Sequence, residues 1–182
     1  PMPGTRNIGI EIPNLIPQVV PIREVLDSKA FQESDAKFPL CLGRTVKNEV
    51  FITDLARMPH LLVAGATGKG KSVCLNAIIT SLLYKKRPSE SKFVLIDPKR
   101  VEFGPYADLE KYYLAKAPGD DRAIITETEC AIKTLNSLVE EMENRYKILE
   151  EVRVRNISEY NDKWQRELRE VCDEHEGKKY QY

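Results

Sequence analysis

Eight consecutive residues, Gly-Ala-Thr-Gly-Lys-Gly-Lys-Ser at positions 65–72, constrain the fold of this chain more than any other part of its sequence. They match the pattern GxxxxGK[ST] at every fixed position. An apolar run without polar alternation, residues 60–64, precedes them, and apolar residues at helical spacing follow as far as Tyr84. This order predicts a strand buried on both faces, a glycine-rich turn and an amphipathic helix. A strand, a turn and a helix are the setting in which the pattern forms a phosphate-binding loop.

The residue types in this loop suit the binding of a triphosphate. Gly65, Gly68 and Gly70 let the backbone adopt positive φ and approach a phosphate with no Cβ in the way, so that successive N–H groups point inward. A helix starting near Lys71 adds the positive end of its dipole, and the Lys71 ammonium can reach the β- and γ-phosphates. Ser72 supplies a hydroxyl for Mg²⁺. The sequence therefore predicts a site for ATP and Mg²⁺ made of Gly65, Ala66, Thr67, Gly68, Lys69, Gly70, Lys71 and Ser72.

Two side chains in and before the loop each allow two interpretations. Lys69 occupies a variable position of the pattern, so it is either a solvated lysine or an additional contact to a phosphate or a neighbouring subunit. His60 is either a general base or a histidine that packs against or caps the preceding strand. The sequence shows no serine or cysteine nucleophile with a partnering carboxylate, which favours the packed or capping histidine.

A second apolar run, residues 93–96, ends at Asp97 and has the form of a Walker B strand, whose carboxylate would hold Mg²⁺. Pro98 follows at once, and the run comes directly after the helix of the phosphate-binding loop. We therefore favour a role for Asp97 in shaping the edge of the site over a role as the metal acid. After Lys99 no other apolar run ends in Asp-Glu. Because a general base is then absent from the sequence, we predict that this chain binds ATP weakly and hydrolyses it negligibly.

The composition is that of an ordinary globular chain and excludes several classes of protein. Its 182 residues leave room for one domain and part of a second. Lys and Arg number 28, as do Asp and Glu, so the chain lacks the basic excess of an independent nucleic-acid binder, and any DNA contact must be local or shared between subunits. No apolar run approaches the roughly 18 residues that span a bilayer. The cysteines Cys41, Cys74, Cys130 and Cys172 show neither CxxC spacing nor nearby histidine pairs, which excludes the usual metal and redox motifs.

Residues 1–58 form a proline-rich segment that we expect to lead into the nucleotide-binding domain without being a domain itself. Alternation at residues 8–12 predicts a strand, and helical spacing predicts a short helix over residues 21–31. Two further strands are predicted around residues 40–42 and 49–52.

Residues 59–182 form the predicted nucleotide-binding domain. The strand at 60–64, the helix after the loop and the strand at 93–96 make one βαβ unit. Residues 111–114 offer a further short strand. A long helix is predicted from about residue 127 to 152, with one apolar stripe that we expect to pack on a sheet. The stripe consists of Ile132, Leu135, Leu138, Val139, Met142, Tyr146, Leu149 and Val152.

The chain resembles the first half of the motor domain of FtsK/SpoIIIE-family DNA translocases. Five sequence blocks carry this resemblance, and they extend from residue 8 to residue 161. They are Ile-Gly-Ile-Glu-Ile-Pro-Asn at 8–14, Pro-His-Leu-Leu-Val-Ala-Gly at 59–65, Ile-Asp-Pro-Lys at 96–99, Glu-Met-Glu-Asn-Arg-Tyr-Lys at 141–147, and Val-Arg-Asn-Ile-Ser-Glu-Tyr-Asn at 154–161.

The resemblance implies an α/β P-loop NTPase fold with a RecA-like, three-layer, parallel-sheet core, partly represented here. It also implies a hexameric, ATP-driven pump for double-stranded DNA that acts in chromosome segregation at cell division. Arg145, Arg153 and Arg155 are then either contacts to a neighbouring subunit or solvated arginines of a helix face. The family has a Walker B strand, DNA-facing loops, a winged helix and N-terminal membrane spans that this sequence does not show. We accordingly expect a cytoplasmic segment of a parent anchored in the bacterial inner membrane.

Three rival functions fit parts of the same sequence. An ATPase of a secretion or conjugation system would move protein or single strands, and sequence beyond Tyr182 would distinguish it by the presence or absence of a winged helix. A P-loop kinase would need a lid and an acceptor pocket, and no lid arginine cluster is visible. The third rival is a nucleotide-binding module without activity.

Overall fold

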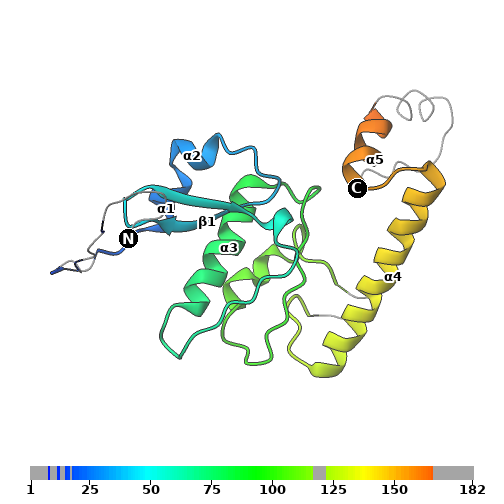
Figure 1. Cartoon of the computed structure of the whole chain (residues 1–182). Coiled ribbons are helices and arrows are strands. Elements are labelled where there is room, and N and C mark those ends of the chain that lie inside the picture. The colour runs from blue at the N-terminus through cyan, green and yellow to red at the C-terminus, as the bar shows by residue number, and fades with distance from the viewer. Residues whose placement is uncertain (1–7, 9–11, 13–14, 17, 117–121, 166–182) are drawn as a thin grey trace. The chain divides into compact units, whose positions relative to one another are not determined.

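The computed structural model describes residues 8, 12, 15, 16, 18–116 and 122–165 (Figure 1). The chain forms two compact units, Pro1–Lys85 and Lys86–Tyr182. The first unit contains the phosphate-binding loop together with the whole N-terminal segment, residues 1–58. The division at residue 58 that the sequence suggests stays a prediction. No helix among the described residues is long and apolar enough to cross a membrane.

An antiparallel hairpin forms the sheet of the first unit. Its strands are β1 (Pro39–Arg44) and β2 (Val50–Asp54), which confirms both strands predicted in this region. The register shifts between Cys41 and Gly43, so Leu42 forms a bulge and has no partner on β2. Asp54 ends the hairpin by accepting hydrogen bonds from the backbone N–H groups of Lys37, Phe38 and Ala56, and the last of these caps the short 3-10 helix η1 (Leu55–Arg57).

The predicted helix over residues 21–31 is interrupted and forms two short helices, α1 (Ile22–Leu26) and α2 (Lys29–Gln32). Ser28 causes the interruption. Its hydroxyl donates to the carbonyl of Val25 at 2.6 Å and accepts from the N–H of Phe31 at 3.2 Å. A serine that bonds to nearby backbone groups in this way ends one helix and caps the next, which helical spacing alone does not reveal. The strand predicted at residues 8–12 lies mostly outside the described residues.

The helix that follows the loop, α3 (Lys71–Lys85), forms as predicted and packs on β1 (Figure 1). A buried hydrogen bond joins the two elements, since the N–H of Cys41 donates to Oγ of Ser81 at 3.0 Å. Lys85 at the other end of α3 donates to the carbonyls of Phe31 and Gln32, the last residues of α2. The core of this unit is formed by Val25, Leu26, Phe31, Leu40, Cys41, Ile79 and Leu82.

Residues 60–64 do not form the buried strand that the sequence predicts. They have no regular secondary structure, and the side chains of Leu61 and Leu62 are 45% and 89% exposed. A parallel strand needs hydrogen-bonded neighbours, and no described residue bonds to the backbone of this segment. The predicted βαβ unit therefore lacks its first strand in the described part of the chain.

In the second unit, residues 93–97 take part in parallel pairing, as the sequence predicts for residues 93–96. Bridges link Phe93 to Leu114 and Ile96 to Ile125. The N–H and C=O of Phe93 bond to residues 113 and 115, while Leu95 O and Asp97 N bond to Ile125. Alternate residues of an extended segment direct their backbone groups to the same side, so both partners lie along one edge of residues 93–97. The short strand expected at residues 111–114 does not form, because residues 111–113 make a turn and only Leu114 takes part in a single bridge.

The long helix α4 (Thr128–Val152) forms with the predicted length, but its apolar stripe is not buried. Thr134 is the buried residue of this helix, and the expectation that the stripe packs on a sheet is wrong for the described structure. Exposure of the stripe ranges from 42% to 57% at Ile132, Leu135, Leu138, Val139, Met142 and Tyr146. The pattern marks a face that favours burial, whereas burial itself needs a partner surface.

A tight joint connects α4 to the short helix α5 (Ile157–Lys163). Arg153 has φ 60° and ψ 47°, and the N–H of Val154 bonds to the carbonyl of Leu149, which together form a Schellman motif. Asn156 caps α5 by accepting from the N–H of Glu159, while Oε2 of Glu159 accepts from the N–H of Arg155. The joint is thus held by backbone hydrogen bonds at both helix ends.

Candidate nucleotide-binding site

Two glycines of the loop are required by the backbone conformation. Gly68 has φ +77° and Gly70 has φ +85°, in the left-handed region where a residue with a Cβ is strained. A Cβ at either position would meet no atom within 4 Å, so crowding is not the reason for glycine. Gly65 differs from these two glycines. Its φ is not positive, and a Cβ would lie 3.7 Å from Cγ of Lys71, which is an ordinary contact.

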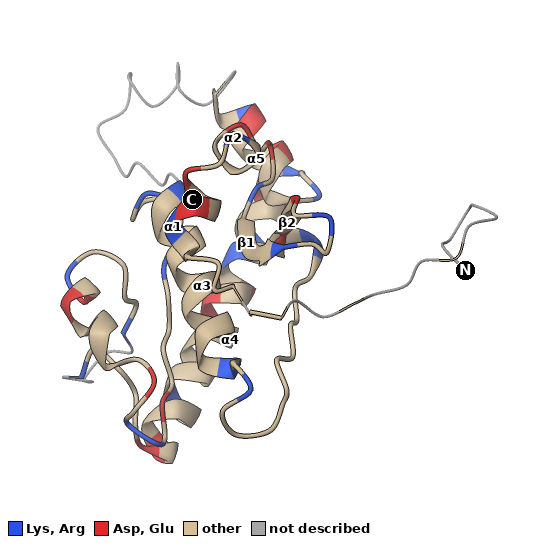
Figure 2. Cartoon of the chain, turned by 90° about the vertical axis from the view of Figure 1, so that its left-hand side faces the viewer, with Lys and Arg blue, Asp and Glu red and all other residues tan. Residues whose placement is uncertain are grey.

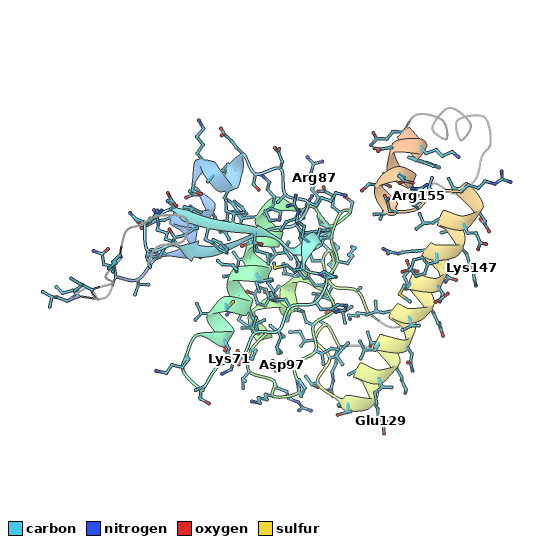
Figure 3. All side chains as sticks on the ribbon, in the orientation of Figure 1. Lys71, Arg87, Asp97, Glu129, Lys147 and Arg155 are labelled. Carbon is cyan, nitrogen blue, oxygen red and sulfur yellow. The ribbon has the colours of Figure 1, made fainter. Side chains whose placement is uncertain are left out.

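The side chain of Lys71 folds back over the loop. Its ammonium donates to the carbonyl of Gly65 at 2.6 Å and to that of Ala66 at 2.9 Å. Figure 3 shows Lys71 at the N-terminal end of α3, where the positive end of the helix dipole lies. The first turn of α3 contains no acidic residue that would offset this charge. A cation and a helix N-terminus therefore meet at one end of the loop.

Most backbone N–H groups of the loop have no acceptor within the described chain. The N–H of Lys69 bonds to the carbonyl of Ala66 at 3.2 Å, and helical bonding begins with the N–H of Cys74 on the carbonyl of Gly70 at 2.9 Å. No described atom accepts from the N–H groups of Thr67, Gly68, Gly70, Lys71 or Ser72. Residues 65–70 are exposed. A curled and exposed row of N–H donors next to a cation is an arrangement that binds anions.

The hydroxyl of Ser72 is also without a hydrogen-bond partner among the described residues. Its position in the first turn of α3, next to Lys71, fits the role of a Mg²⁺ ligand that the sequence predicts. Lys69 is exposed, and no described carboxylate forms an ion pair with it, so both interpretations of Lys69 stay open. His60 is exposed as well, so it is not packed in a core, and its role as a cap or as a general base stays a prediction.

Asp97, in the second unit, binds the backbone of its own turn. Its Oδ2 accepts from the N–H groups of Glu102 at 2.8 Å and Phe103 at 3.2 Å, and its side chain is buried. Burial raises the pKa of this carboxyl, but the N–H groups of Glu102, Phe103, Arg100 and Lys99 together hold it below the ordinary value. These contacts support the loop-shaping role for Asp97. No described cluster of three His, Cys, Asp or Glu side chains could hold a metal ion.

The three arginines proposed for subunit contacts lie at the end of α4 and in the joint to α5. Arg145 pairs with Glu141 one helical turn away, at 2.8 Å, with both side chains about half exposed, which fits a solvated helix face. Arg153 and Arg155 are exposed and no described carboxylate pairs with them. Their predicted role in subunit contacts stays a prediction.

The residues that hold the loop helix in place were not found from the sequence. Ser81 lies completely buried on α3, accepts from the N–H of Cys41 and donates to the carbonyl of Ala77 at 2.6 Å. Its only sequence signal was a hydroxyl next to Leu82 and Leu83 in the apolar part of the helix. The capping role of Asp54 was not predicted from the sequence either, although an acid at the end of a strand is a known cap of the following turn.

The glycine-rich loop, the basic helix start and the parallel pairing define a P-loop NTPase of the α/β class. A family model, FtsK/SpoIIIE family, matches residues 21–174. The chain belongs to the FtsK/SpoIIIE family, as the resemblance of its sequence blocks indicates.

Relatives with assigned names support this membership. The chain is 52% identical over 164 residues to DNA translocase FtsK of Chlorobaculum tepidum, covering 90% of this chain and 20% of the relative. It is 47% identical to DNA translocase FtsK of Haemophilus influenzae, covering 89% and 29%, and 44% identical to DNA translocase SpoIIIE of Bacillus subtilis, covering 89% and 20%. The chain thus spans between a fifth and three tenths of the length of these relatives.

A solved structure shows the same fold. The pCW3 conjugation coupling protein TcpA, in its monomer form with ATPγS, matches with a TM-score of 0.56 and 31% sequence identity. The match covers 80% of this chain and 40% of TcpA. It confirms the α/β P-loop class predicted from the sequence, although only short parallel bridges of the sheet are present among the described residues.

Proposed function

We propose that this chain is the ATP-binding part of a hexameric, ATP-driven translocase for double-stranded DNA that acts in chromosome segregation and cell division. The observation that carries the proposal is a set of loop N–H donors without an acceptor among the described residues, placed beside the Lys71 ammonium. They belong to Thr67, Gly68, Gly70, Lys71 and Ser72. The named relatives in this family are DNA translocases. On that ground we assign DNA as the substrate and translocation as the activity. Each of these wider roles belongs to the proposal.

The loop can bind a triphosphate with few rearrangements. The ammonium of Lys71 bonds to two carbonyls, Gly65 O and Ala66 O, and phosphate oxygens are stronger acceptors for a cation than neutral carbonyls. The positive φ values of Gly68 and Gly70 keep the donors in place before a nucleotide arrives. The Ser72 hydroxyl would hold Mg²⁺, and this ion neutralises charge on the β- and γ-phosphates.

DNA binding by this chain alone should be weak. Lys and Arg balance Asp and Glu, and Figure 2 shows the two kinds of residue interspersed along the described ribbon, not gathered in one element. Attraction to a polyanion is then local, and a hexamer would combine the local contacts of several subunits. By kinship we place this segment in the cytoplasm, with the membrane anchor in another part of the parent.

Hydrolysis should be negligible in this chain. No described cluster of carboxylates suits a metal ion, and Asp97 uses its Oδ2 atom to hold its own turn. Because no other apolar run after Lys99 ends in Asp-Glu, we expect the attacking water to lack a general base. Steady-state phosphate release well above that of Lys71→Ala would show that this part of the proposal is wrong.

The proposal is tested by nucleotide affinity. Isothermal titration with Mg·ATPγS compares the chain with Lys71→Ala and with Lys47→Ala, which removes an exposed lysine of the hairpin turn. Loss of a charge-assisted contact should weaken affinity roughly tenfold to a hundredfold for Lys71→Ala. Lys47→Ala should bind as the parent does. Equal affinity in all three proteins would contradict the proposal.

The likeness to TcpA favours one second candidate, an ATPase of a conjugation system. Such a protein would move single strands or protein instead of duplex DNA. Competition between duplex and single-stranded DNA for the longer parent protein separates the two. Preference for the duplex supports the chromosomal translocase, and preference for single strands supports the conjugation ATPase.

A further inference from the structure

A fixed turn in the second unit carries two adjacent cations without an anionic partner. Lys99 and Arg100 are both exposed, and no described carboxylate forms an ion pair with either. Several other cations of this unit form ion pairs, as Lys86 does with Glu90 and Arg122 with Glu127. Residues 99 and 100 therefore form a local positive site on a chain whose net charge is zero.

Asp97 holds this turn in one conformation. Its carboxylate accepts from the N–H groups of Glu102 and Phe103, and its carbonyl accepts from the N–H of Arg100 at 3.1 Å. Asp97 is only 4% exposed as a residue, so water competes little for these bonds. Figure 3 shows Asp97 at this turn. The backbone at Lys99 and Arg100 is thus set before any partner binds.

The backbone of Arg100 is held in a conformation that does not favour arginine. Its φ is 59°, a left-handed conformation that glycine or asparagine adopts at lower cost. The exposed side chain of Arg100 forms no ion pair with a described carboxylate, so pairing does not offset this cost. Strain of this kind, at an exposed residue, is a reason to look for a binding function.

We propose that Lys99 and Arg100 contact the phosphodiester backbone of double-stranded DNA. The proposal rests on the function proposed above and assigns one DNA-contacting element of the motor to this turn. Two neighbouring cations on an exposed, fixed turn can contact the regularly spaced phosphates of a duplex. The duplex can reach them because the turn lies on the protein surface.

The same geometry argues against a nucleotide at this turn. A triphosphate is held by backbone N–H groups that point into a concave loop, as the donors of residues 67–72 can do. At residues 99–103 the equivalent N–H groups of Arg100, Glu102 and Phe103 already bond to Asp97. The turn can offer only side-chain charges, and these are sufficient for a backbone phosphate.

The salt dependence of duplex binding tests the proposal. A labelled duplex is titrated with the 182-residue chain by fluorescence anisotropy at several salt concentrations. The double variant Lys99→Gln/Arg100→Gln should bind more weakly. The slope of log affinity against log salt should become less steep by roughly 0.9 for each lost phosphate contact. The matched control Lys133→Gln/Lys147→Gln removes two exposed lysines of α4 and should keep the parent's slope.

A second variant separates binding from folding. Arg100→Gly removes the cation and relieves the left-handed strain, so its thermal midpoint should rise while its duplex affinity falls. A purely structural role for Arg100 would lower both. An unchanged slope in Lys99→Gln/Arg100→Gln, or an equal loss in the α4 control, would overturn the proposal. The proposal would also be overturned if Lys99→Gln/Arg100→Gln lost affinity for Mg·ATPγS while its duplex binding stayed intact. The Mg·ATPγS affinity of Lys71→Ala tests the ATP site separately, so a failure of the proposed function can be distinguished from a failure of this proposal.

Discussion

The hydroxyl of Ser81 on α3 lies 3.0 Å from the N–H of Cys41 on β1 and accepts its hydrogen bond in a fully buried position. This bond connects the helix that begins at the phosphate-binding loop to the hairpin of the N-terminal segment. The N-terminal segment therefore helps to fix the orientation of α3, and with it the direction of the loop donors at its start.

Ser81→Ala should destabilise the first unit by about 1–3 kcal/mol, because it leaves the buried N–H of Cys41 without an acceptor. Urea unfolding followed by circular dichroism measures the change. Ser89→Ala, at an exposed position, is the control and should leave the midpoint unchanged. Equal midpoints for Ser81→Ala and the parent would show that the bond does not hold α3 in place.

Substitutions at the loop glycines should separate folding from binding. Gly68→Ala and Gly70→Ala force a Cβ into a left-handed conformation and should each cost about 1 kcal/mol of stability. Gly65→Ala meets only ordinary contacts, so it should fold like the parent yet bind Mg·ATPγS more weakly. Gly104→Ala has open space and no positive φ and serves as the neutral control. Unchanged nucleotide affinity in Gly65→Ala would contradict a close approach of phosphate at residue 65.

Arg153→Gly should stabilise the joint between α4 and α5 by about 1 kcal/mol, since glycine suits the left-handed C-cap of a Schellman motif. Lys147→Gly inside α4 is the opposite control and should cost about 1 kcal/mol. Thermal unfolding of both variants provides the measurement. A fall in stability on Arg153→Gly would mean that the arginine side chain makes stabilising contacts.

Acid should weaken the hairpin through Asp54. The N–H of Phe38 chiefly lowers the pKa of this carboxyl from 3.8, while partial burial opposes the shift, and the N–H groups of Ala56 and Lys37 and the charge of Arg57 reinforce it. A folded pKa below the unfolded one gives stability that is full above pH 4 or so and is lost as pH falls through the folded value. The denaturant midpoints of the parent and Asp54→Asn should therefore converge as the pH is lowered from neutral towards 2 or so. A constant difference between them would contradict this role for Asp54.

Local patterns predicted local structure well in this chain. The helices α3 and α4 and both strands of the hairpin follow from spacing and alternation, which act within one element. The loop also followed from its residues, since positive φ at Gly68 and Gly70 is a property of glycine itself. The interruption at Ser28 was missed because one hydroxyl decides it.

Burial could not be predicted in the same way. The runs at 60–64 and along α4 are apolar enough to be buried, yet Leu62 and Ile132 are exposed at 89% and 54%. An apolar pattern records which surface favours burial, whereas the partner that covers it is a separate part of a fold. The role of Asp97 depends in the same manner on contacts with residues 102 and 103, which no strand pattern reveals.

In the proposed function, main-chain amides of the phosphate-binding loop hold a triphosphate. Two-dimensional NMR of the ¹⁵N-labelled chain, titrated with Mg·ATPγS, observes those amides directly. We expect large shifts for Gly68, Gly70, Lys71 and Ser72, which disappear in Lys71→Ala, while the amides of the hairpin turn at residues 45–49 stay in place. Loop amides that do not move at saturating nucleotide would contradict the proposed function.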